Sequence, residues 1–208
     1  MPTLEVASVV REFEWNDFYD RLRDFGAQFI DDATAQTQSS RTPDTHIVLK
    51  RVMPEDLPVF VKQEMGHLAV QHLQIFWIKA RSCGMIHTDG LDRHCALNIP
   101  LRNTDLGIQE WFEHPFTEYA FRGNGTVSRV TTEEVHQYPL KWDKPASLQL
   151  VLKKPTVVNT NMWHRVDNRN NPNHRYVISL RFKDNPSFEH VVRCLTPVED
   201  LPYEPPTA

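Results

Sequence analysis

The stretch Arg175–Phe182, with the sequence RYVISLRF, decides the fold class that we expect for this chain. It is rich in β-branched and aromatic residues, which favour a β-strand. Successive side chains of a strand point to opposite faces, so Arg175, Ser179 and Arg181 would share one face, together with a valine. The other face would carry Tyr176, Ile178, Leu180 and Phe182.

Eight more runs of this kind follow one another closely from residue 73 onward. Clusters of Gly, Pro, Asn and Asp separate them, and Gly123-Asn124-Gly125 predicts a hairpin turn because Asn and Gly tolerate positive φ. Many short strands at close spacing favour an antiparallel sandwich or barrel. The runs lie at residues 74–79, 94–101, 108–112, 118–122, 126–131, 147–152, 156–160 and 189–195.

The first 72 residues are expected to be mainly helical. An apolar stripe through residues 17–35, with members three or four positions apart, predicts an amphipathic helix. The strand-like run His46–Val52 follows, and Pro54 with the acidic residues after it predicts a second helix within 54–72. The stripe consists of Phe18, Leu22, Phe25, Phe29 and Ala33.

One domain over residues 1–208 is expected, mainly β with N-terminal helices. Hydrophobic residues make up 40% of the chain and charged residues 24%, which is an ordinary globular balance. A chain of this length buries roughly 70% of the surface that it exposes when unfolded, so its core needs no disulfide or metal. We expect residues 1–72 to support a β core at 73–195, and the proline-rich residues 196–208 to form an extended tail.

Composition and charge argue against several classes of protein. The 23 Lys and Arg residues and 27 Asp and Glu residues give a net charge of −4, so we expect no nucleic-acid partner. The chain has only seven glycines and no GxGxxG or GxxxxGK[ST] motif for binding nucleotide phosphates. No apolar run reaches the roughly 18 residues of a membrane span. Three cysteines without a CxxC pair, and no signal-peptide pattern, favour the cytoplasm.

Two histidines, one aspartate and one arginine occur in an order that suggests chemistry. In the sequence GMIHTDG, His87 and Asp89 are two positions apart, so at a strand end they leave the same face and can reach one cation. Alone, this pair is weak evidence for a metal site, because the side chain of Asp89 could instead hydrogen-bond to its own backbone in a turn. His164 follows a predicted strand, and Arg175 comes eleven residues later. Two histidines and a carboxylate can occupy one face of an iron ion and leave three positions open, and an arginine offers a fork for a carboxylate.

This ordered pattern resembles the 2-oxoglutarate and Fe(II)-dependent dioxygenase superfamily, over residues 73–193. The sequence HRVDN that begins at His164 also resembles the aspartyl/asparaginyl β-hydroxylase branch, although that branch typically lacks the carboxylate ligand that Asp89 would provide. The resemblance implies a double-stranded β-helix (jelly-roll, cupin-like) fold. It also implies that His87, Asp89 and His164 bind iron and that Arg175 binds the distal carboxylate of 2-oxoglutarate.

The activity that the resemblance implies is hydroxylation of a peptide, an amino acid or a small molecule, with release of succinate and CO2. Its cofactors would be Fe(II) and the cosubstrate 2-oxoglutarate, and ascorbate would assist. Asn98 and Ser179 are further candidates for binding 2-oxoglutarate, with purely structural or solvent-facing roles as the alternative. The candidates for a substrate site, each of which could instead be a rim or core residue, are Arg102, Trp111, Arg129 and Arg181.

Two other functions fit the same residues. A cupin-like module could bind a ligand without redox chemistry, in which case His164 or Asp89 would point away from a common centre. A metal-dependent hydrolase or isomerase could use the same three ligands with Zn²⁺, and it would not need Arg175. The sequence has neither a GxSxG nor an HExxH motif, which argues against a serine hydrolase and against a zinc protease of that kind.

Overall fold

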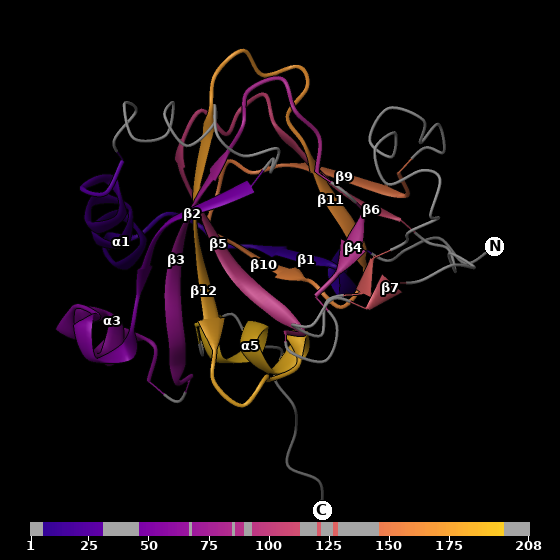
Figure 1. The fold of residues 1–208 in the computed structure, drawn as a ribbon. Helices are drawn as coiled ribbons and strands as arrows, with labels where there is room; N and C mark the ends of the chain where they lie inside the picture. The colour runs from indigo at the N-terminus through magenta and orange to yellow at the C-terminus, as the bar shows by residue number, and fades with distance from the viewer. Residues whose placement is uncertain are drawn as a thin grey trace, which may run out of the picture.

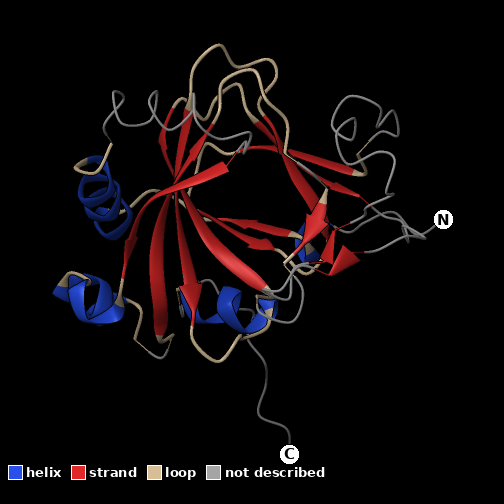
Figure 2. Ribbon diagram, viewed as in Figure 1, coloured by secondary structure: helices blue, strands red, loops and turns tan. Residues whose placement is uncertain are grey.

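The computed structural model describes residues 6–30, 46–66, 68–84, 86–89, 93–112, 120–121, 127–128 and 146–197. These residues form two antiparallel sheets of six strands each, which face one another (Figures 1 and 2). The first sheet has the order β1-β10-β5-β12-β3-β2, and the second has the order β7-β8-β4-β11-β6-β9. The prediction of a mainly β chain is therefore confirmed.

Most predicted runs correspond to strands of these sheets. The predicted runs have the same first and last residues as the observed strands β2, β6 and β12. Other predicted runs overlap β3, β5, β7, β8, β9 and β10. No predicted run covers β1, β4 or β11. The first sheet contains β1 (Val10–Glu12), β2 (His46–Val52), β3 (Val70–Ile78), β5 (Cys95–Arg102), β10 (Thr156–Asn159) and β12 (Arg175–Phe182). The second contains β4 (His87–Thr88), β6 (Ile108–Phe112), β7 (Ala120–Phe121), β8 (Val127–Ser128), β9 (Leu148–Val151) and β11 (Trp163–Asp167).

The predicted strand at 189–195 is wrong, because this segment belongs to helix α5 (Phe188–Leu195). The side chain of Ser187 caps the helix by accepting a hydrogen bond from the backbone N–H of His190, at 3.2 Å. Phe188 and Val191 are three positions apart and both buried in the main core, a spacing that places them on one face of a helix. The neighbouring valines that suggested a strand therefore lie on a helix.

Helix α1 (Asp17–Ala27) confirms the helix predicted near the N-terminus, over a shorter range. It begins after Asn16, whose side chain accepts a hydrogen bond from the backbone N–H of Tyr19 at 3.1 Å. The helix ends at Ala27 rather than at residue 35, and residues 31–45 lie outside the described part of the chain.

Strands also belong to the N-terminal third. In the predicted helical segment 54–72, the structure has a 3-10 turn (Pro54–Asp56) and the short helix α3 (Val59–Glu64), after which the chain enters β3. β1 and β2 form the two edges of the first sheet, by pairing with β10 and β3. None of the described helices is long and apolar enough to cross a membrane.

The main hydrophobic core lies between the first sheet and the helices. Leu22 of α1, Val61 of α3 and Val191 of α5 are fully buried in it. Figure 1 shows α1 and α3 beside the first sheet, on the side away from the second sheet. The helices therefore cover the outer face of the first sheet. The sheet residues of this core include Leu73, Ile75, Leu97, Ile99, Ile178 and Leu180.

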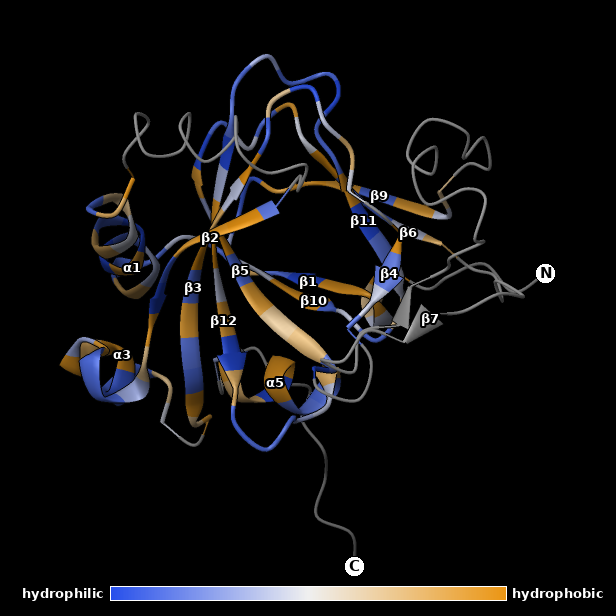
Figure 3. Cartoon of the chain, in the orientation of Figure 1, coloured by the Kyte–Doolittle hydropathy of each residue, from blue (hydrophilic) through white to orange (hydrophobic). Residues whose placement is uncertain are grey.

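The inner face of the first sheet, which faces the second sheet, has a polar centre. Gln74, Ser179, Asn98 and Thr156 are neighbours in one row across β3, β12, β5 and β10. They alternate along each strand with residues of the main core, so their side chains point away from it. Gln74, Ser179 and Thr156 are buried. The alternation is visible as bands of colour along β3 in Figure 3.

Some predicted features lie outside the described residues, namely the turn Gly123-Asn124-Gly125, Arg129 and the tail from residue 198. The strands on either side of that turn, β7 and β8, pair antiparallel with Phe121 opposite Val127. All three cysteines are free thiols. Cys83 and Cys95 are buried, whereas Cys194 is exposed.

Replacing Gly26 by Ala should destabilise the protein, although alanine is the better helix former. A methyl group at this position of α1 would lie 2.5 Å from Ile178 Cδ1 and 3.2 Å from Leu101 Cδ2. Because Ile178 is fully buried, we expect overpacking to lower the free energy of unfolding by about 1–2 kcal/mol. Urea denaturation measures this change. The control is Asp24→Ala, at an exposed position of α1, whose free energy of unfolding should stay within about 0.5 kcal/mol of wild type. A Gly26→Ala variant as stable as wild type would contradict the close packing of α1 on the sheet.

Candidate metal centre

His87 and His164 lie side by side on the second sheet. They are Cα partners in the antiparallel pairing of β4 with β11, and their ring centroids are 4.5 Å apart. The next partner in the same row is Trp111 of β6, which packs against Ala96 and Val158 of the first sheet. Because residues in one row of a sheet share a face, both imidazoles face the first sheet. In Figure 3, β11 is largely hydrophilic along its length.

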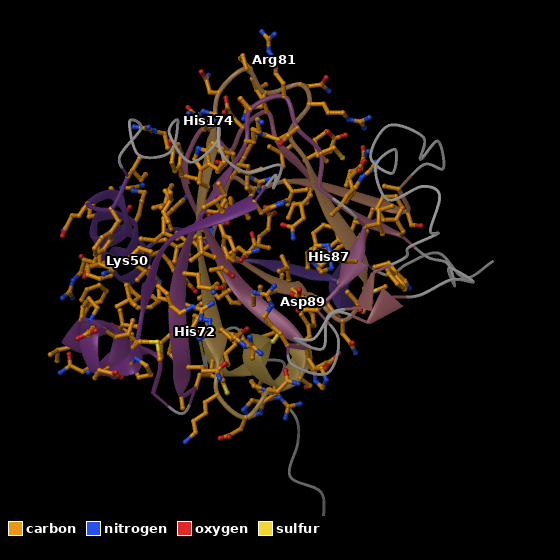
Figure 4. All side chains as sticks on the ribbon, viewed as in Figure 1. Lys50, His72, Arg81, His87, Asp89 and His174 are labelled. Atoms are coloured by element: carbon orange, nitrogen blue, oxygen red, sulfur yellow. The ribbon has the colours of Figure 1, made fainter. Side chains whose placement is uncertain are left out.

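Asp89 completes a group of three possible metal ligands. It follows β4 directly, and its backbone N–H donates to the carbonyl oxygen of Thr160 at 2.9 Å. Its Oδ1 lies 3.7 Å from Nε2 of His87, and one ligand atom from each of His87, Asp89 and His164 lies within 4.8 Å of the others. Figure 4 shows His87 and Asp89 together on the β4 side of the space between the sheets. The structure therefore brings together the three residues that the sequence singled out.

The main chain orients the ring of His164. Its Nδ1 lies 2.7 Å from the carbonyl oxygen of Met162. A carbonyl oxygen can only accept, so Nδ1 carries the hydrogen and Nε2 keeps a free lone pair. Such a bond from the non-ligating nitrogen is the usual way in which a protein fixes a metal-binding histidine. Trp111 packs beside this ring, fully buried, and its Nε1 donates to the carbonyl oxygen of Asn159 at 3.2 Å.

Arg93 binds Asp89 and was not predicted from the sequence. Its Nε donates to Oδ2 of Asp89 at 2.5 Å, and its Nη2 contacts the same oxygen. Burial alone would raise the pKa of Asp89, but the charge of Arg93 is the main influence that lowers it to about 2. The carboxylate is therefore anionic at neutral pH. Because Arg93 occupies Oδ2, Oδ1 is the oxygen left to bind a cation.

His164 is neutral at neutral pH, as a metal ligand must be. Burial is the main cause that lowers its pKa, and the nearby His87 acts in the same direction against the opposing effect of Asp89, with a net value of about 4. Two imidazole nitrogens and one carboxylate oxygen form a donor set that suits divalent transition metals.

Arg175 is the fourth predicted residue, at the first position of β12. It is 1% exposed, yet its Nε and Nη1 have no hydrogen-bond partner among the described residues. Burial lowers its pKa to about 10, so the guanidinium is still charged at neutral pH. A side-chain carbon at Gly107 would lie 2.9 Å from Arg175 Cδ and 2.7 Å from Oδ1 of Asn168, so glycine is needed there. A buried charge with unpaired donors is costly, and an anionic ligand would relieve that cost.

The remaining predicted residues take different positions. Asn98 and Ser179 lie in the polar row on the inner face of the first sheet, and Arg181 lies on the same face beside His72. Trp111 is a core residue next to His164. Arg102 pairs with Tyr176 on the opposite face, with its Cζ 4.8 Å from the centre of that ring, so it points away from the metal-binding group. Arg129 lies outside the described residues.

A further imidazole near this group, that of His46, was also not predicted. Its neighbours include His87, His164, Asp89 and Arg175, all of which influence its pKa.

The comparisons with known proteins name no function for these residues, since no protein-family model and no curated protein matches the chain. The functional assignment therefore depends on the chemistry of the site.

Replacing His164 by Ala should abolish tight binding of a divalent metal ion. Only two of the three donors would remain, and one of the two imidazoles would be lost. Equilibrium dialysis with Fe(II) under anaerobic conditions, or with Mn(II), measures the bound metal per chain. His190→Ala removes an exposed imidazole of α5 and is the matched control. If His164→Ala retains wild-type metal affinity, the group is not a metal site.

Acid should destabilise the metal-free protein. The folded pKa of His164 is about 4, below its ordinary value of 6.5, so the unfolded chain takes up a proton between these values that the folded chain does not. Stability therefore falls as the pH drops from about 6.5 to about 4, by on the order of 3 kcal/mol. Urea denaturation with a chelator, near pH 7 and near pH 5, measures the upper part of this fall, about 2 kcal/mol. His164→Asn removes the titrating ring and should reduce the pH dependence; an unchanged dependence would contradict this assignment.

Proposed function

We propose that this chain is a non-haem Fe(II) and 2-oxoglutarate-dependent oxygenase. It would hydroxylate a peptide, an amino acid or a small molecule, with one oxygen atom of O2 entering the product and the other entering succinate, as CO2 is released. The observation that carries the proposal is the pairing of two sites on facing sheets. One is the group of His87, Asp89 and His164, and the other is the buried guanidinium of Arg175, whose Nε and Nη1 lack partners among the described residues.

The proposed fold is the double-stranded β-helix, or jelly roll. Its support is a set of nested antiparallel pairs: β6 with β9, β5 with β10, β4 with β11 and β3 with β12. These are the pairs of one long hairpin that has been rolled up. Rolling places β3, β5, β10 and β12 in one sheet and β4, β6, β9 and β11 in the other. This is the arrangement expected for an eight-strand jelly roll.

The donor set fits Fe(II). Nitrogens of His87 and His164 and Oδ1 of Asp89 would hold one face of the ion, which leaves other positions for ligands that are not protein. When bound, Fe(II) supplies the activation of O2, with 2-oxoglutarate as the reductant. The protein's own part is to hold these donors: Met162 fixes the ring of His164, and Arg93 fixes the carboxylate of Asp89.

Arg175 fits a dicarboxylate cosubstrate. A guanidinium donates charge-assisted hydrogen bonds to carboxylates, and Nε and Nη1 of Arg175 are donors without a partner among the described residues. Gly107 leaves room around this guanidinium, since any larger residue would overlap Arg175. Asn98 and Ser179 add hydrogen-bonding groups on the same inner face, where they would contact the cosubstrate. The buried free thiols Cys83 and Cys95 suit a reducing compartment, and we propose a cytoplasmic location.

Incubating the pure protein with Fe(II), ascorbate and 2-oxoglutarate should yield succinate, even without a substrate. His87→Ala should abolish this turnover because it removes a metal ligand. Succinate is measured by mass spectrometry, with a chelator-treated sample as the blank. The proposal fails if the wild-type protein binds neither Fe(II) nor 2-oxoglutarate. A non-redox binding module would bind a ligand but form no succinate.

Arg175→Gln should separate the oxygenase from a metal-dependent hydrolase or isomerase. The variant keeps all three metal-binding residues, so it should retain metal while its affinity for 2-oxoglutarate falls about 10–100-fold, as expected for the loss of a charge-assisted contact. Gly107→Ala should act in the same direction by displacing the guanidinium. Full activity of Arg175→Gln on any substrate would favour the hydrolase or isomerase.

A further inference from the structure

His46, the first residue of β2, shares a row of the first sheet with Arg175. The strand register places His46 opposite Ile78 of β3, and Ile78 opposite Arg175 of β12. Residues in one row of a sheet point to the same face, so His46 and Arg175 both point toward the second sheet. The metal-binding group projects from that second sheet.

The ring of His46 lies against Gly84, in the segment just before β4. A side-chain carbon at Gly84 would lie 2.6 Å from Cε1 of His46 and 3.4 Å from its Nδ1. The main chain is fixed at this point, because the backbone N–H of Gly84 donates to the carbonyl oxygen of Val166 in β11 at 2.9 Å. The imidazole therefore reaches across from one sheet to the segment that leads into His87.

The electrostatic surroundings of His46 include both parts of the proposed site. Its pKa is lowered to about 3, mainly by burial and to a smaller extent by His87, Arg175 and His164, against the opposing effect of Asp89. At neutral pH the ring is therefore uncharged, with one N–H donor and one acceptor nitrogen. An uncharged donor can bind an anion in this region without adding to the positive charge of Arg175 and a metal ion.

We propose that His46 binds the 2-oxo acid cosubstrate, by donating a hydrogen bond to one of its oxygens while Arg175 holds the distal carboxylate. This inference rests on the proposed function, which places the cosubstrate between the metal and Arg175. His46 is in the row of Arg175, and its ring lies against Gly84, three residues before His87. A cosubstrate that extends from the metal to Arg175 then passes the imidazole.

Calorimetric titration of 2-oxoglutarate into the Mn(II)-loaded full-length chain tests this role without turnover. His46→Ala should raise the Kd for 2-oxoglutarate about 10–100-fold, since a hydrogen bond to a charged ligand is lost. The affinity for Mn(II) should stay within about twofold, because every metal-binding residue is intact. His190→Ala, on the exposed side of α5, is the matched control with no expected change.

Two conservative variants show whether the ring acts through a hydrogen bond. The amide of His46→Asn can take the place of Nδ1, and that of His46→Gln can take the place of Nε2. Recovery by one of them identifies the donating nitrogen. Gly84→Ala moves the ring without removing it, and should raise the Kd several-fold. It also serves as the test if His46→Ala does not fold.

The outcomes separate this inference from the proposed function. If wild type binds 2-oxoglutarate and His46→Ala, or Gly84→Ala in its place, binds it equally well, the role of His46 is refuted and the oxygenase proposal stands. A loss of 2-oxoglutarate binding that matches an equal loss of Mn(II) binding would make His46 a structural residue, which also refutes the inference. If the wild type binds Mn(II) but no 2-oxoglutarate, the proposed function fails, and the role of His46 with it.

Discussion

The antiparallel pairing of His87 with His164 is the constraint on which the site depends. β4 has only two residues, but bonds on both sides of it hold its register. The N–H of Gly84 donates to Val166, and the N–H of Asp89 donates to Thr160, each at 2.9 Å. A slip of one residue would turn the side chains of β4 to the other face of the sheet and separate His87 from His164. The main-chain pairing therefore brings the donors together.

The position of the hydrophobic core leaves the inner face of the first sheet available for polar chemistry. Leu22, Ile178 and the other main-core residues stabilise the sheet from its outer side, under the helices. A charge such as that of Arg175 can then be buried with donors that lack partners among the described residues, because the apolar burial on the outer face offsets the cost. Gly107 also serves the polar inner side rather than the core, because its lack of a side chain leaves space for the guanidinium of Arg175.

Local patterns allowed part of this structure to be predicted. The strands β2, β6 and β12 could be predicted because composition and alternation are visible in the sequence. The two adjacent valines of α5 suit a strand as well as a helix, and this segment was wrongly predicted to be a strand. The order of His87, Asp89, His164 and Arg175 was also visible. Arg93 and His46 were not, because their contacts are made by the fold. Arg93 is four residues from Asp89 in a part of the sequence where no helix was predicted, and the register of β2 that places His46 contains an irregularity after Val48. No spacing rule covers either case.

Charge explains why the two arginines near the metal-binding group have different roles. Arg93 is paired with Asp89, so these two charges cancel, and the rings of His46 and His164 are neutral at neutral pH. Of these charged groups, all of them in the described part of the chain, only Arg175 is left without a compensating charge. A divalent cation alone would bring this region to three positive charges, and repulsion between partly buried charges is strong. A dianionic 2-oxo acid bound with the cation returns the region to one positive charge. Under the proposed function, metal and cosubstrate therefore favour each other's binding, and an uncharged His46 can contact the cosubstrate without opposing that balance.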